Sequence, residues 1–81
     1  MRQIIEQELV LELLLAEIEN FSESNGYAPS VRDLTHRLDL KSTATTHKFV
    51  AIAKRRGLLS STKGVARSLR LTTEGKLLIQ P

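Results

Sequence analysis

Two short amphipathic segments, separated by only three residues, constrain this chain more than any other feature of its sequence. The first covers residues 30–38 and the second covers residues 42–56, and each begins with a serine able to cap a helix, Ser30 or Ser42. Asp33 completes an arrangement that resembles a capping box, with Asp in place of the preferred Glu. Two helices joined by so short a turn are typical of a helix-turn-helix.

The residues on either side of this pair predict a helix before it and a hairpin after it. Residues 2–23 contain no Pro or Gly and many strong helix formers, so they are predicted to form one helix. Residues 58–61 and 68–72 read as the two strands of a β-hairpin. The predicted fold is mostly α with a small β-hairpin wing, a winged helix-turn-helix, in a single domain over residues 1–81. The tail over residues 73–81 stays open between a final helical turn and a third strand.

Charge is strongly polarised along the chain. Residues 1–40 carry three basic and eight acidic side chains, a net charge of −5, whereas residues 41–81 carry nine basic and one acidic, a net charge of +8. One interpretation is an ordinary solvated basic surface. The other is a face that binds a polyanion, because clustered Lys and Arg side chains release counterions condensed on nucleic acid.

The second helix of the pair favours the polyanion interpretation, because one of its faces has small or basic side chains and no acidic ones. That face consists of Ala44, His47, Lys48, Ala51 and Arg55. Small residues allow close approach to a major groove, Lys and Arg reach phosphates or guanine, and Thr and His read base edges. The basic hairpin tip, with Lys63 and Arg67, is expected to contact the sugar-phosphate backbone.

The first helix carries two apolar stripes, which is more than one small core requires. One is predicted to face the core and consists of Val10, Leu11, Leu14, Leu15, Ile18 and Phe21. The other consists of Ile5, Leu9, Leu13 and Ala16. Packing under the C-terminal tail and self-association both remain open for this second stripe. We hypothesise that the chain forms a homodimer. The interface would consist of Ile5, Leu9 and Leu13 of this stripe with Leu77 and Leu78 of the tail.

Other functional classes find less support. The absence of cysteine excludes disulfides and thiolate metal sites, and the run from Leu9 to Ile18 is too short and too acidic to span a bilayer. His36 and His47 lie apart without an acidic cluster, so no metal, cofactor or small-molecule ligand is expected and catalysis is not predicted. Ser60, Ser61 and Lys63 are better explained by a polar turn than by a catalytic dyad. A protein-binding adaptor, docking a basic partner on the acidic first helix, remains the main alternative.

Four motifs, taken together, resemble the N-terminal DNA-binding domain of LexA repressors. They are Gly-Tyr-Ala-Pro-Ser-Val-Arg-Asp-Leu at 26–34, Leu-Asp-Leu-Lys-Ser at 38–42, Thr-Thr-His at 45–47 and Arg-Gly-Leu-Leu at 56–59. The resemblance extends over residues 26–71 without a gap. It implies a sequence-specific winged helix on double-stranded DNA, acting as a repressor in a bacterial cytoplasm. The chain would be either an SOS-response repressor fragment or a small phage or mobile-element regulator.

The resemblance also implies roles for individual residues. The family's base-reading positions fall at the start of the second helix of the pair, on Ser42, Ala44, Thr45, His47 and Lys48, and Arg67 matches its wing arginine. Two residues depart from the pattern: Asp39 replaces the usual turn glycine, and Lys48 replaces a small residue of the closest variant. The family's self-cleaving serine-lysine peptidase domain has no counterpart here, so dimer contacts are expected from the first helix or the tail.

Overall fold

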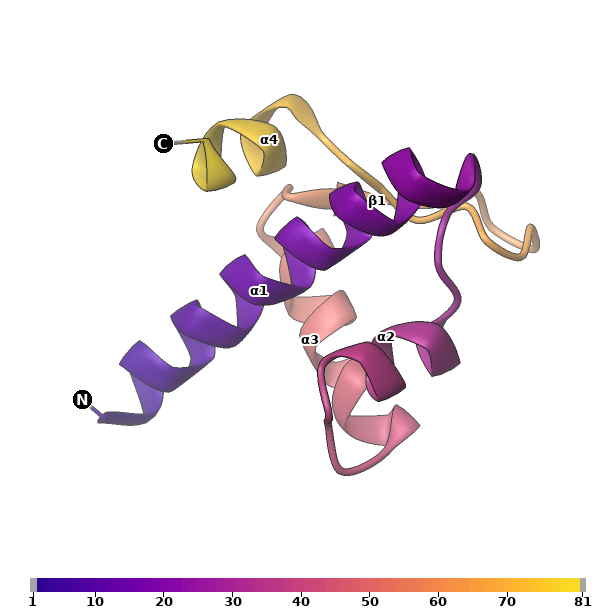
Figure 1. Cartoon of the computed structure of the whole chain (residues 1–81). Coiled ribbons are helices and arrows are strands. Elements are labelled where there is room, and N and C mark those ends of the chain that lie inside the picture. Colours follow the sequence, from indigo (N-terminus) through magenta and orange to yellow (C-terminus); the bar gives the residue numbers. More distant parts are fainter. Residues whose placement is uncertain (1, 81) are drawn as a thin grey trace.

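The computed structural model describes the backbone of residues 2–80 and the side chains of residues 7–80. That part of the chain forms four helices and a two-stranded antiparallel hairpin whose loop projects from one side of the molecule (Figure 1). The elements are α1 (Arg2–Asn25), α2 (Val31–Arg37), α3 (Thr43–Arg55), β1 (Leu59–Ser60), β2 (Arg70–Leu71) and α4 (Thr73–Ile79). The predicted fold class, mostly α with a small hairpin wing, is confirmed.

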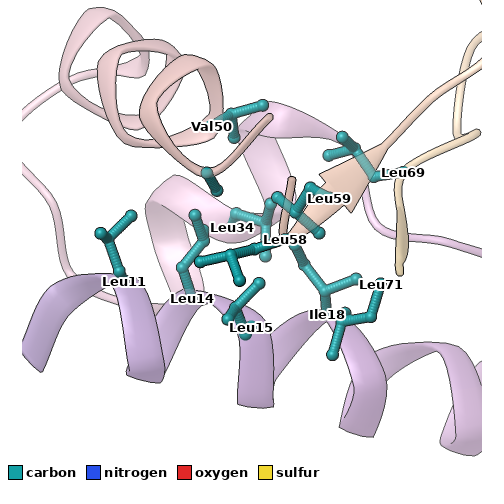
Figure 2. Close-up of a cluster of buried hydrophobic side chains, with 11 residues drawn as sticks. Leu11, Leu14, Leu15, Ile18, Leu34, Val50, Leu58, Leu59, Leu69 and Leu71 are labelled. Atoms are coloured by element: carbon teal, nitrogen blue, oxygen red, sulfur yellow. The ribbon is translucent and has the colours of Figure 1, made fainter. Parts of the chain in front are cut away.

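A leucine-rich core joins α1 to every other part of the fold. Figure 2 shows the inner side chains of α1 directed toward α2, α3 and the hairpin. These buried side chains are Leu11, Leu14, Leu15, Ile18, Leu34, Val50, Ala53, Leu58, Leu59, Leu69 and Leu71. Full burial of one leucine contributes about 1.5–3 kcal/mol, so this cluster holds the helix-turn-helix and the hairpin against α1. The core stripe predicted for α1 is confirmed, although Val10 lies at its half-buried edge.

The local signals around the turn between α2 and α3 are confirmed in atomic detail. Ser30 and Asp33 form the expected capping box, since each side chain accepts a hydrogen bond from the other residue's backbone N–H at 3.0 Å. The Ser42 side chain caps α3 by accepting from the Thr45 N–H. Asp39 takes the left-handed conformation expected of a turn glycine, with φ +53°. Aspartate tolerates this region better than most residues, so the turn keeps its geometry.

A buried polar contact joins α2 to α3. Thr46 has 0% of its surface exposed, and its Oγ1 lies 2.6 Å from Oγ1 of Thr35. Thr35 in turn donates to the carbonyl oxygen of Val31 at 2.8 Å. A buried hydroxyl without a partner is costly, so this pair fixes the two helices at one distance.

The hairpin is shorter than predicted. Pairing is limited to Leu59 with Leu71 and Ser60 with Arg70, whereas the sequence predicted strands over residues 58–61 and 68–72. Backbone pairing between the strands does not continue to Thr62, because its N–H donates to the Ser68 side-chain Oγ, at 2.9 Å, instead of to a backbone carbonyl oxygen. Residues 61–69 therefore form a projecting loop, the orange segment of Figure 1, which we call the wing.

The tail forms a helix, which settles the alternative left open by the sequence. Thr72 caps α4 by accepting from the Gly75 N–H at 3.1 Å. Gly75 is buried against Leu58, the residue just before β1, where an added Cβ would lie only 2.2 Å from the Leu58 carbonyl oxygen. The absence of a side chain at Gly75 lets α4 pack closely against the backbone of Leu58. None of the helices over residues 2–80 is long and apolar enough to cross a membrane.

Candidate nucleic-acid interface

The outer face of α3 is exposed along its whole length. Thr46, Val50 and Ala53 are buried on the inner side. The outer residues Ala44, His47, Lys48, Ala51 and Arg55 are all exposed. The periodicity of the sequence therefore assigned each face of α3 correctly, and the predicted contact residues on this helix lie together on one surface.

Two of the predicted base-reading residues also build the start of α3. The Ser42 Oγ accepts from the Thr45 N–H at 3.3 Å and lies 3.3 Å from the Thr45 Oγ1. Ser42 is exposed and Thr45 is half-buried. Their hydroxyls are thus held at the N-terminal end of the helix, which is the end that meets base edges in helix-turn-helix complexes.

Three cations of α3 and the wing have no acidic partner among residues 7–80. Within residues 7–80, three ion pairs join acidic side chains of α1 and α2 to arginines elsewhere: Glu8–Arg56, Glu17–Arg37 and Asp33–Arg67. In the same part of the chain, no ion pair involves Lys48, Arg55 or Lys63. The Lys48 Nζ instead lies 5.9 Å from the centroid of the Phe49 ring. These cations remain available to an anionic partner.

A groove separates α3 from the wing. Its lining includes His47 and Lys54 of α3, Lys63 and Arg67 of the wing, and Ser30 at the start of α2. All four of these lining cations or potential cations come from elements predicted to face DNA. The groove has the charge that a phosphate backbone requires.

Arg67 lies in the wing, as predicted, but its guanidinium turns toward α2. Its Nη1 donates to the Asp33 Oδ2 at 2.8 Å and to the Ala28 carbonyl oxygen at 3.2 Å. The hydrogen bond from the Ser30 backbone N–H, followed by the one from Arg67, lowers the pKa of Asp33 below its ordinary value. The sequence did not reveal this partnership, because the two residues are 34 positions apart.

Comparison with known proteins identifies the family of this chain. Residues 5–68 match the sequence model of the LexA DNA binding domain family. The chain belongs to this family. The matched residues include most of α1, the helix-turn-helix and almost all of the wing, whereas α4 begins beyond them at Thr73.

Individual relatives agree with the family assignment of this LexA-type domain. The LexA repressor of Enterococcus faecalis is 39% identical over 61 residues, which cover 73% of this chain and 29% of that protein. The LexA repressor of Acetivibrio thermocellus is 31% identical over 70 residues, 86% of this chain and 31% of that protein. The LexA repressor of Lactobacillus helveticus is 35% identical over 63 residues, 78% of this chain and 30% of that protein. The chain spans about 30% of the length of these relatives.

The second apolar stripe of α1 lies away from the core and beside α4. Leu9 and Leu13 are 54% and 59% exposed, and Leu77 and Leu78 of α4 are 63% and 39% exposed. A groove between the two helices is lined by Leu9, Leu13, Ala16 and Leu78, among others. The tail therefore covers the stripe only in part. Ile5, the fifth residue of the predicted dimer surface, has a side chain outside the described residues.

The described residues contain no candidate metal-binding site. Among residues 7–80, no group of three or more His, Asp or Glu side chains is placed to hold a metal ion. His47 lies in the groove beside the wing, and His36 is exposed on α2. The two histidines therefore belong to different surfaces.

Proposed function

We propose that this LexA-type domain binds double-stranded DNA sequence-specifically, with α3 in the major groove and the wing on the sugar-phosphate backbone. The observation that carries the proposal is the outer face of α3, which is exposed, small or basic, and free of acidic side chains. It lies on the second helix of a helix-turn-helix, the element that enters the major groove in this class of protein.

The roles of individual side chains follow from their position and chemistry. Ser42, Thr45, His47 and Lys48 would contact base edges from the start of α3, and the small Ala44 would allow close approach. Farther along the molecule, Arg55 and Lys63 would contact phosphates. Arg67 would support the wing through the contacts described above. Base contacts select the sequence, whereas phosphate contacts set affinity and orientation.

Alanine substitutions separate these two kinds of contact. On a duplex selected from random sequences, His47→Ala or Lys48→Ala should relax base preference at one or two positions, each costing about 1–3 kcal/mol. Arg55→Ala or Lys63→Ala should weaken binding to every sequence and reduce the salt slope by about 0.9. Lys76→Ala is the matched control, because it removes the same charge from α4. If all four site variants bind like the control, the proposed interface is wrong.

We further propose that the domain acts as a homodimeric transcriptional repressor. One small module makes too few contacts to select a site well, and helix-turn-helix proteins commonly use two half-sites. Leu9 and Leu13 of α1, with Leu77 and Leu78 of α4, give an apolar surface unusual for a monomer. Ile5 continues this stripe in the sequence. Glu12 of α1 also lines the groove between these two helices.

Sedimentation at tens of micromolar tests the dimer. Wild type is expected to sediment as a dimer and Leu13→Glu as a monomer that remains folded, because Leu13 lies outside the core. Ser24→Glu, which adds the same charge to an exposed position near the end of α1, is the control. A monomeric wild-type protein that binds its selected duplex tightly would overturn the homodimer.

A reporter assay tests repression. Placing the selected duplex across a promoter should reduce transcription when the domain is present, because the bound protein occludes the site. Lys48→Ala should restore expression. Increased transcription with wild type would contradict repression, and failure to bind any duplex at low salt would favour the protein-adaptor alternative instead.

A further inference from the structure

Arg67 connects the wing to the beginning of the helix-turn-helix by three different contacts. Its guanidinium donates to the Asp33 carboxylate and to the Ala28 carbonyl oxygen, as given above, and its Cζ lies 5.1 Å from the centroid of the Tyr27 ring. Such a planar fork of donors suits a carboxylate, a carbonyl and an aromatic face at the same time. The wing is therefore tied both to α2 and to the loop that precedes it.

The backbone of Arg67 is strained at the same place. Its φ of +54° lies in the left-handed region, which residues other than glycine rarely occupy. A conformation of this kind persists where surrounding contacts compensate for its cost. Gly64, at the other left-handed position of the wing, has no such cost. Arg67 is thus both the strained residue of the wing and the residue whose side chain contacts α2 and the loop before it.

Asp33 joins two parts of the molecule through a single oxygen. Its Oδ2 accepts from the Ser30 backbone N–H at 3.0 Å and from Arg67 at 2.8 Å. The first bond belongs to the cap of α2, and the second holds the wing. The start of α2, α3 and the wing, with Lys63, border one groove, so the carboxylate joins two of the three elements that line it.

We propose that Arg67 is a positioning residue, which together with Asp33 latches the wing against α2 and does not itself contact a DNA phosphate. Both hydrogens of the Arg67 Nη1 are directed to Asp33 and Ala28, so a phosphate contact would have to come from Nη2 or Nε, or replace these bonds. Lys63, on the same wing, carries its charge without an ion pair in the described part of the chain. The latch contacts are present in the free protein. Only the effect of the latch on affinity for DNA rests on the proposed function.

Hydrogen exchange in the free protein tests the latch without DNA. The Thr62 N–H bonds the Ser68 Oγ and the Val65 N–H bonds the Thr62 carbonyl oxygen, so both amides report on the wing. Arg67→Ala and Asp33→Asn should each speed their exchange by about twofold to fivefold, the range expected for one exposed ion pair.

The double variant and a distant amide complete the exchange experiment. Arg67→Ala with Asp33→Asn should exchange no faster than the faster single variant, because both changes remove the same tie. The Thr72 N–H, which bonds the Leu58 carbonyl oxygen outside the wing, should exchange at the wild-type rate in all variants. The latch would be overturned if the Thr62 and Val65 amides exchanged at the wild-type rate in the single variants. It would also be overturned if the double variant multiplied the rate increases of the two single variants.

Salt dependence on a selected duplex separates a latch from a phosphate contact. Lys63→Ala should reduce the salt slope by about 0.9. Arg67→Ala should keep the wild-type slope while raising Kd by about twofold to fivefold, and Asp33→Asn should do the same. A reduced slope in Arg67→Ala, with unchanged affinity in Asp33→Asn, would make Arg67 a phosphate contact and overturn the proposal. If wild type binds no duplex, the proposed function fails, and hydrogen exchange still decides whether the latch exists.

Discussion

Replacing Thr46 by valine should destabilise the fold strongly, although the two side chains have nearly the same shape. The Thr46 Oγ1 lies 2.6 Å from the Thr35 Oγ1, a distance that only hydrogen-bonded oxygens tolerate. A methyl carbon needs about 3.5 Å, so α2 and α3 would have to separate by about 1 Å. A different rotamer offers no escape, because valine carries methyl groups at both branches and is held to one χ1 in helices.

The size of the effect follows from two contributions. Loss of the hydrogen bond costs about 1 kcal/mol. Overpacking a tight contact costs about 1–3 kcal/mol, so Thr46→Val should lose about 2–4 kcal/mol in total. Thr46→Ser keeps the hydroxyl and loses one methyl group, which costs about 1 kcal/mol.

Thermal unfolding followed by circular dichroism measures both variants. For a domain of this size, each 1 kcal/mol corresponds to about 4–8 °C in Tm, so Thr46→Val should melt at least about 8 °C below wild type. Thr46→Ser should melt above Thr46→Val. A valine variant as stable as wild type would refute the idea that a short polar contact sets the distance between α2 and α3.

Three further changes test other local interactions. Gly75→Ala should lower the urea midpoint, because the added Cβ would lie 2.2 Å from the Leu58 carbonyl oxygen. This clash should outweigh the preference of alanine over glycine in a helix, about 1 kcal/mol, and an unchanged midpoint would contradict the close approach. The Ser30 N–H and other partners lower the pKa of Asp33, so its contribution to stability is present above the unfolded pKa of about 3.9 and is lost as pH falls through the folded value. The difference in urea midpoint between wild type and Asp33→Asn should therefore shrink below about pH 4, and a constant difference would count against this cause. Ser42→Ala should lose about 0.5–2 kcal/mol of stability through its helix cap, and a loss of DNA affinity alone would show that the cap is unimportant.

Local patterns in the sequence predicted the elements that follow local rules. Capping depends on residues three apart, so Ser30 with Asp33 predicted the start of α2 correctly. Helical periodicity likewise assigned the two faces of α3 before any contact was known. Asp39, which replaces the family's turn glycine, takes the left-handed conformation that aspartate tolerates better than most residues.

Contacts between distant residues were not predictable in the same way. Arg67 meets Asp33 across 34 positions, and Thr46 meets Thr35 across 11, so neither pair leaves a periodic signal. Gly75 is recognisable as a close approach only after Leu58 is placed against it. The second stripe of α1 was visible in the sequence, but how far α4 covers it depended on tertiary packing.

Selection from randomised duplex DNA, with wild type beside a His47→Ala/Lys48→Ala double variant, tests the central claim most directly. Wild type should enrich one sequence, arranged as an inverted repeat for a dimer. The double variant should lose enrichment at particular base positions while keeping salt-sensitive binding, because its phosphate contacts remain. If both proteins enrich the same sequence equally well, or if wild type enriches none, α3 does not read DNA in the way proposed here.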